Sequence, residues 1–164
     1  MPPRAPNRLR AGPTCCCVIA GPLCSVPGAA RVVAPQPEQQ PTRLLLVEDD
    51  PTIAEMYSFA LRARGHHVTT AGDGLQALEL MRGHRFDLVL LDLVMPLLDG
   101  FKVLAELRER PLPAPVPVVV LTNLSEPSVL TRARGLGALD VRVKSSTTPT
   151  MLSRLIDEWL SLGG

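Results

Sequence analysis

The stretch FDLVLLDLVMPLLDG, residues 86–100, contains an apolar run that ends in a carboxylate. The run 88–91 suits a strand that is buried on both faces, as strands of parallel sheets are. Asp92 follows it directly, and apolar residues then resume. A charge at the end of a core strand costs free energy unless a group of opposite charge accompanies it. The stretch therefore predicts a buried parallel strand that delivers a charged group to the edge of the sheet.

The segments on both sides of this stretch alternate between two patterns. Short apolar runs predict strands, and apolar residues at helical spacing, some preceded by a capping acid or an early proline, predict helices. The predicted strands span residues 43–48, 66–71, 86–92, 118–122 and 139–143. The predicted helices span residues 51–64, 75–83, 101–110, 127–135 and 148–160. Five strands alternating with five helices predict an α/β protein with a doubly wound parallel sheet that helices cover on both faces.

Composition excludes several classes of protein. The chain has 164 residues, of which 46% are apolar and 3% aromatic, so an aliphatic core is expected. The formal net charge of +1 gives no reason to expect a nucleic acid or an anionic membrane as partner. No uninterrupted apolar run approaches the roughly 18 residues that a membrane span needs. The length fits one domain with an appendage.

Residues 1–41 differ from the rest of the chain. They are rich in Pro, Arg, Ala and Gly, and they show neither helical nor strand periodicity, so we predict a disordered N-terminal extension. All four cysteines (Cys15, Cys16, Cys17 and Cys24) lie here. They cannot cross-link the core and do not have zinc-binding spacing, so we expect free thiols in the reducing cytoplasm. Prolines and glycines interrupt the only candidate signal sequence. A start codon assigned too far upstream is the alternative explanation for this segment.

Polar side chains follow four of the predicted strands. Glu48 and Asp49 follow the first strand, Asp92 the third, Thr122 ends the fourth, and Lys144 follows the fifth. Doubly wound sheets gather such residues beyond the carboxyl ends of their strands. Clustered carboxylates repel one another, and a hard divalent cation with oxygen ligands, such as Mg²⁺, relieves that repulsion. Two cations beside one carboxylate predict a site for phosphoryl transfer, with Asp92 as the nucleophile.

Four segments together resemble the signature of bacterial response-regulator receiver domains. They are RLLLVEDDP (43–51), LVLLDLVMPLLDG (88–100), VVVLTN (118–123) and VRVKS (141–145). Each alone is weak evidence, but their order and spacing all fit. The resemblance covers about residues 42–162 and implies a flavodoxin-like fold with strand order 2-1-3-4-5.

The resemblance also implies a function and a set of roles. The chain is expected to be a cytoplasmic signalling switch of a two-component system rather than a conventional enzyme. The implied metal ligands, for Mg²⁺, are Glu48, Asp49, Asp92 and the main-chain carbonyl of Val94. Asp92 would accept the phosphoryl group from a histidine kinase or phosphotransfer protein, and Thr122 and Lys144 would contact it. Output is expected through an unknown downstream protein, because the chain ends at Gly164, just after the last predicted helix.

Departures from the family pattern at four positions bear on this hypothesis. Val141 stands where the family usually has an aromatic residue, and Ser145 stands where a proline usually follows the lysine. Val94 and Leu124 occupy the two positions that flank the path of the hydrolytic water in the family. Neither side chain can orient a water molecule, so we expect the phosphorylated form to be long-lived.

Two other functions stay open at this point. A receiver-like interaction module that is never phosphorylated would explain Val141 but leaves the complete set of charged residues unexplained. A Mg²⁺-dependent phosphatase or phosphotransferase acting on small molecules would use the same nucleophile. Such enzymes commonly carry a second acid two residues after the nucleophile, and Val94 occupies that position.

Overall fold

The computed structural model describes residues 41–162. The predicted N-terminal extension lies outside these residues, apart from Pro41, and its disorder stays a prediction. Among the described residues, no helix is long and apolar enough to cross a membrane.

Five parallel strands form a single sheet in the described part of the chain. They are β1 (Arg43–Val47), β2 (His67–Ala71), β3 (Leu88–Leu91), β4 (Val118–Thr122) and β5 (Asp140–Val143). Their order across the sheet is β2-β1-β3-β4-β5, and every neighbouring pair is parallel. The predicted fold class and strand order are confirmed.

Five α-helices connect and follow the strands. They are α1 (Pro51–Arg62), α2 (Gly74–Gly83), α3 (Gly100–Glu109), α4 (Pro127–Gly135) and α5 (Pro149–Leu162), with a single 3₁₀ turn, η1 (Lys144–Ser146), before the last. Asp50, Asp73 and Asp99 cap the first three helices by accepting backbone N–H groups of the first turn. Helix α1 begins at the predicted residue, and α2 and α3 each begin one residue before the predicted start, directly after their capping acids.

Strand β3 is shorter than predicted at both ends. At its start, the Asp87 N–H donates to the Arg43 carbonyl at 2.8 Å, while the Asp87 carboxylate accepts the Arg43 N–H at 2.7 Å, so a side chain supplies one of the two contacts there. At its end, the Asp92 carboxylate accepts the N–H groups of Leu93 and Val94, which turns the chain away from the ladder. In both places a carboxylate binds backbone N–H groups beside the end of the strand.

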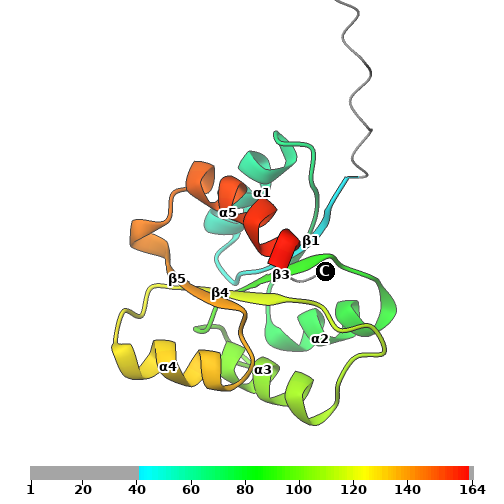
Figure 1. Ribbon diagram of the computed structural model, residues 1–164, viewed down its shortest axis with the longest axis vertical. Coiled ribbons are helices and arrows are strands. Elements are labelled where there is room, and N and C mark those ends of the chain that lie inside the picture. The colour runs from blue at the N-terminus through cyan, green and yellow to red at the C-terminus, as the bar shows by residue number, and fades with distance from the viewer. Residues whose placement is uncertain (1–40, 163–164) are drawn as a thin grey trace, which may run out of the picture. The chain divides into compact units, whose positions relative to one another are not determined.

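The core consists of two layers, one on each face of the sheet (Figure 1). Helices α1 and α5 cover one face, and α2, α3 and α4 cover the other. Leu88 and Leu90 of β3 point into the first layer, and Val89 and Leu91 point into the second. All four side chains are fully buried. This two-sided burial explains the continuous apolar run in the sequence and leaves the charged residues at the strand ends.

Candidate functional site

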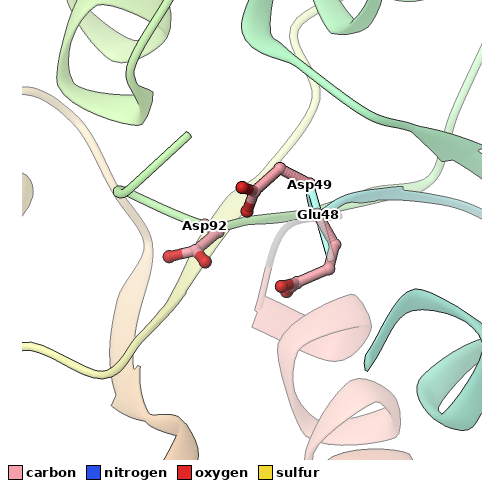
Figure 2. Close-up of side chains that lie close together, drawn as sticks. All are labelled: Glu48, Asp49 and Asp92. Carbon is pink, nitrogen blue, oxygen red and sulfur yellow. The ribbon is translucent and has the colours of Figure 1, made fainter. Parts of the chain in front are cut away.

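Three carboxylates meet at the carboxyl edge of the sheet. Glu48 and Asp49 follow β1, and Asp92 follows β3, which is the neighbour of β1. One oxygen from each lies within 4.8 Å of the other two (Figure 2). Glu48 and Asp92 are buried, whereas Asp49 is exposed to solvent. The structure thus brings together three residues that the sequence predicted to share a site.

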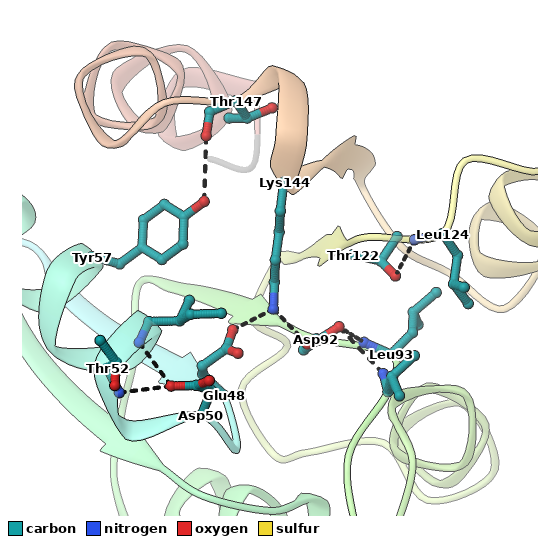
Figure 3. Close-up of polar contacts among 12 residues, drawn as sticks. Glu48, Asp50, Thr52, Tyr57, Asp92, Leu93, Thr122, Leu124, Lys144 and Thr147 are labelled. Carbon is teal, nitrogen blue, oxygen red and sulfur yellow. Dashed lines mark hydrogen bonds and ion pairs between the residues drawn. The ribbon is translucent and has the colours of Figure 1, made fainter.

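Lys144 provides the positive charge of the site. It begins the turn η1 after β5, and its side chain is only 7% exposed. Its Nζ donates to Glu48 Oε2 and to Asp92 Oδ2, each at 2.5 Å, so the ammonium lies between the two buried carboxylates (Figure 3). Hydrogen bonds with charge on both partners are the strongest kind in proteins. The lysine that follows the fifth strand is therefore part of the same site.

The second oxygen of Asp92 is held by the backbone. Asp92 Oδ1 accepts the N–H of Leu93 at 2.6 Å and that of Val94 at 3.2 Å. Each oxygen of the carboxylate thus has its own partner, with backbone N–H groups on Oδ1 and the ammonium on Oδ2. The carboxylate is consequently fixed in orientation by contacts on both of its oxygens.

Gly100 allows the chain to fold closely around Asp92. A Cβ at this first residue of α3 would collide with the Asp92 carbonyl oxygen and would lie 2.9 Å from the Cα of Leu93. The Gly100 N–H also donates to the Leu93 carbonyl at 3.1 Å. The absence of a side chain at Gly100 thus lets the start of α3 pack directly against the backbone of Asp92 and Leu93.

The pKa shifts at the site reflect burial first and then the balance between carboxylates and the single ammonium. Burial raises the pKa of the Glu48 carboxyl, and this outweighs the lowering by Lys144, while Asp92 and Asp49 raise it further. Burial lowers the pKa of Lys144, but its hydrogen bonds to Asp92 and Glu48 outweigh that effect and leave its pKa raised. The ammonium therefore stays charged, and the cluster has capacity for additional positive charge.

Thr122 and Val94 lie beside this cluster in different ways. Thr122 ends β4, next to β3, and is fully buried; its Oγ1 accepts the N–H of Leu124 at 3.1 Å (Figure 3). Val94 is 58% exposed two residues after Asp92. Among residues 41–162, no hydrogen bond joins Thr122 to the three carboxylates or to Lys144. The predicted role of Thr122 toward a phosphoryl group stays a prediction.

Val141 occupies a core position on β5. Its side chain is buried in the layer beneath α4, together with Ala133 and Val120. A buried valine has no large ring that could change between an inward and an outward position. The valine that replaces the usual aromatic residue is therefore part of the core beneath α4.

The donor set fits a hard divalent cation. Three carboxylates offer only oxygen ligands, they lie close together, and the exposed Asp49 leaves room for water ligands. Mg²⁺ is usually bound by one or two carboxylates together with several water molecules. An acidic cluster of this kind at the carboxyl ends of β1 and β3 is typical of the Mg²⁺ site of receiver domains.

Comparison with protein families gives a match over most of the described residues. The family of the response regulator receiver domain matches residues 44–156, which include all the predicted site residues. The gliding motility regulatory protein of Myxococcus xanthus is 34% identical over 128 residues, which are 78% of this chain and 16% of that protein. The DNA-binding response regulator MtrA of Mycolicibacterium smegmatis is 37% identical over 113 residues, 69% of this chain and 48% of that protein. The chain thus spans less than half the length of these relatives.

Comparison with solved structures also gives a response regulator, and here the match extends over almost the whole of the other chain. The chemotaxis response regulator CheY4 of Vibrio cholerae superposes with a TM-score of 0.66 at 29% sequence identity. The match covers 72% of this chain and 98% of the CheY4 chain. The part of the chain that matches CheY4 is therefore about the size of that entire protein.

Proposed function

The chain belongs to the response regulator receiver domain family, and we propose that it is a switch that accepts a phosphoryl group on Asp92 and signals by protein contact. Receiver domains are signalling modules of two-component systems rather than conventional enzymes. The observation that carries the proposal is the position of Lys144, whose ammonium lies between two buried carboxylates beside a third. A structural ion pair would need only one carboxylate.

The proposed metal ligands are those that the sequence suggested. Glu48, Asp49 and Asp92 would hold Mg²⁺ with the main-chain carbonyl of Val94, and the family resemblance is the source of the last. The fit of the three carboxylates supports this set. When bound, Mg²⁺ offsets negative charge that develops on the phosphoryl oxygens.

Phosphoryl transfer would proceed by attack of an Asp92 carboxylate oxygen on phosphorus. A P–O bond forms to Asp92 while the P–N bond to the donor histidine breaks. The histidine nitrogen leaves with the bonding electron pair and can then take up a proton. Backbone N–H groups on Oδ1 hold the carboxylate in orientation during this step. Lys144, already bonded to Oδ2, would remain close enough to bind a phosphoryl oxygen.

Thr122 would act after transfer. Its hydroxyl lies on the neighbouring strand and bonds only to the Leu124 N–H among the contacts of the described residues. We propose that it exchanges this bond for one to a phosphoryl oxygen. Such a movement would shift the β4–α4 loop and thereby change the surface that a partner recognises.

A receiver domain implies a histidine kinase as partner. We propose that this kinase, or a phosphotransfer protein, supplies the phosphoryl group to a receiver domain that spans residues 42–162. The downstream partner would be a protein, with no nucleic acid or membrane contact made by the domain itself, and we place the reaction in the cytoplasm. The family is the basis for each of these assignments.

One experiment tests the function. The full chain is incubated with Mg²⁺ and acetyl phosphate, a small phosphodonor, and is then analysed by intact mass spectrometry. Wild type should gain one phosphoryl group that is stable in acid and labile in base, and Asp92→Asn should gain none. Asp87→Asn, which alters an acid at the other end of β3, is the matched control and should react like wild type. No gain in wild type would favour the phosphorylation-independent module.

We further propose that the phosphorylated form is long-lived. Val94 is exposed two residues after Asp92, and Leu124 follows Thr122 by two residues, so apolar residues occupy both positions that flank the path of the hydrolytic water in the family. Hydrolysis needs a water molecule that is oriented toward phosphorus. Val94→Asn should therefore shorten the half-life of the phosphorylated chain, whereas Leu97→Asn, a polar change at an exposed position of the same loop, should leave it unchanged. Rapid loss of the phosphoryl group from wild type would contradict the proposal.

A further inference from the structure

The turn that carries Lys144 has few local constraints. Residues 144–146 form one 3₁₀ turn, closed by the Thr147 N–H, which donates to the Lys144 carbonyl at 3.2 Å. The turn contains no proline, so no ring fixes its backbone angles. The Ser146 hydroxyl also donates to the Val143 carbonyl at 3.0 Å, so both bonds connect only the turn and its flanking residues. Short 3₁₀ turns have poorer hydrogen-bond geometry than α-helices, and these local bonds do not tie the turn to the rest of the fold. The position of the ammonium must therefore depend on contacts from elsewhere in the fold.

Tyr57 of α1 makes one such contact. Its ring is 2% exposed and packs in the core layer between α1 and α5, with neighbours such as Leu61 and Ile156. Its hydroxyl donates to the Thr147 carbonyl at 3.3 Å, across 90 residues of sequence (Figure 3). Burial raises the pKa of Tyr57, so the phenol stays protonated and able to donate. The hydrogen bond thus connects the middle of α1 with the end of the lysine-bearing turn.

We propose that Tyr57 is a positioning residue for Lys144, because its hydroxyl ties the turn that carries Lys144 to helix α1. The inference rests on the proposed role of Lys144 in phosphoryl transfer. Helix α1 begins at Pro51, directly after Glu48 and Asp49, with Asp50 as its cap. One helix would therefore fix two parts of the site, the acids through its start and the ammonium through Tyr57. Without the tether, the ammonium would spend less time between the two buried carboxylates.

Tyr57→Phe tests this inference, because it keeps the ring in the core and removes only the hydroxyl. Ser153→Ala is the matched control: Ser153 is equally buried, and its Oγ donates to the Pro149 carbonyl within α5 at 3.0 Å. Both variants lose one side-chain hydrogen bond to a backbone carbonyl, and urea titrations should show similar losses of stability. Only the first loses a bond to the turn.

Two measurements on the full chain separate positioning from stability. The first is the rate of phosphorylation by acetyl phosphate at saturating Mg²⁺, which should fall by about 2- to 10-fold in Tyr57→Phe, the range expected for one hydrogen bond. The second is amide hydrogen exchange at Thr147, which should accelerate by a similar factor. Ser153→Ala should change neither. Saturating Mg²⁺ keeps any change in metal affinity out of the comparison of rates.

The outcomes distinguish this inference from the proposed function. A wild-type rate in Tyr57→Phe, or an equal slowing in Ser153→Ala, would overturn the positioning role while the switch itself stands. If wild type accepts no phosphoryl group, the proposed function fails, and the positioning role for phosphoryl transfer fails with it. Hydrogen exchange then still decides whether the tether exists, since unchanged protection of Thr147 in Tyr57→Phe would exclude it.

Discussion

Strands β1 and β3 are linked by charged side chains at both ends, and the two ends differ in burial. At the amino end, Arg43 and Asp87 form an ion pair at 3.0 Å, with side chains that are 51% and 37% exposed. At the carboxyl end, Lys144 bonds Glu48 and Asp92, and all three side chains are at most 7% exposed. The same two strands thus have a solvent-exposed ion pair at their amino ends and a buried charge cluster at their carboxyl ends.

The two groups of charges differ both in their exposure to solvent and in the balance between positive and negative charge. The exposed pair has one charge of each sign, is screened by solvent, and contributes little to stability. The buried cluster has more carboxylates than ammonium groups, so its charge is not balanced by the protein alone. An unbalanced buried charge is costly in a resting fold but useful where a cation and a phosphoryl group are to bind.

Removal of Lys144 should produce the largest effect. Lys144→Met leaves two buried carboxylates without a counter-charge, which should lower the free energy of unfolding by about 3 kcal/mol in the absence of metal. Urea titration in EDTA measures this loss, and Mg²⁺ should restore part of it. The matched variant, Arg43→Met at the exposed end, should change stability far less. Equal losses of stability in Lys144→Met and Arg43→Met would show that the buried and exposed charges do not differ as we propose.

A methyl group at Gly100 should produce the next largest effect. Gly100→Ala forces the backbone of Asp92 and Leu93 to move and should cost about 2 kcal/mol, together with a slower phosphorylation rate. Gly83→Ala, near the amino end of β3, is the control, because a Cβ there meets nothing within 4 Å. It should be neutral or stabilising by about 0.5 kcal/mol. Thermal unfolding of both variants measures the contrast.

The contribution of Glu48 to the free energy of unfolding should change with pH in the opposite direction to that of an ordinary surface acid. Because its pKa is raised in the folded state, protonation favours folding, and this contribution is present below the unfolded value of about 4.3. It is lost as the pH rises through the raised pKa. In EDTA, Glu48→Gln should therefore gain stability relative to wild type as the pH rises through this range. With saturating Mg²⁺ the order should reverse, since the variant lacks a carboxylate ligand.

The contribution of Asp87 to stability should be the smallest of the four, and its pH dependence should have the opposite sign to that of Glu48. Hydrogen bonding from Arg43 lowers the pKa of Asp87, so its contribution is present above the unfolded value of about 3.9. It is lost as the pH falls through the lowered pKa. Asp87→Asn should be slightly less stable than wild type at pH 7 and equal to it in strong acid, by urea titration. A stability difference at pH 7 as large as that of Lys144→Met would show that the exposed pair is not weak.

Much of the fold follows from local patterns in the sequence. The strand 118–122 and the helix 127–135 have the predicted bounds, because apolar runs and an early proline act within a few residues. The ends of β3 were predicted less well, since carboxylates from Asp87 and Asp92 bind backbone N–H groups there. Such side-chain contacts depend on where a neighbouring segment lies.

The site was predictable for a related reason. In a parallel sheet, carboxyl ends share an edge, so the sequence alone places Glu48, Asp92 and Lys144 together. Tyr57 was not identified, although it is the only tyrosine of the chain and lies at a core position of its helix. The partner of its hydroxyl is a backbone carbonyl 90 residues away. Because every residue has a backbone carbonyl, nothing in the sequence marks this partner.

The sequence by itself determined the strand and helix order, the edge at which charges collect, and which charged residues lie at that edge, because periodicity and strand-end position are local properties. Only the tertiary structure decided that Lys144 bonds both Glu48 and Asp92, that Gly100 closes against Asp92, and that Tyr57 reaches the turn after β5. These contacts join segments that lie far apart along the chain. Their distances are set by how the helices pack on the sheet, which no local pattern specifies.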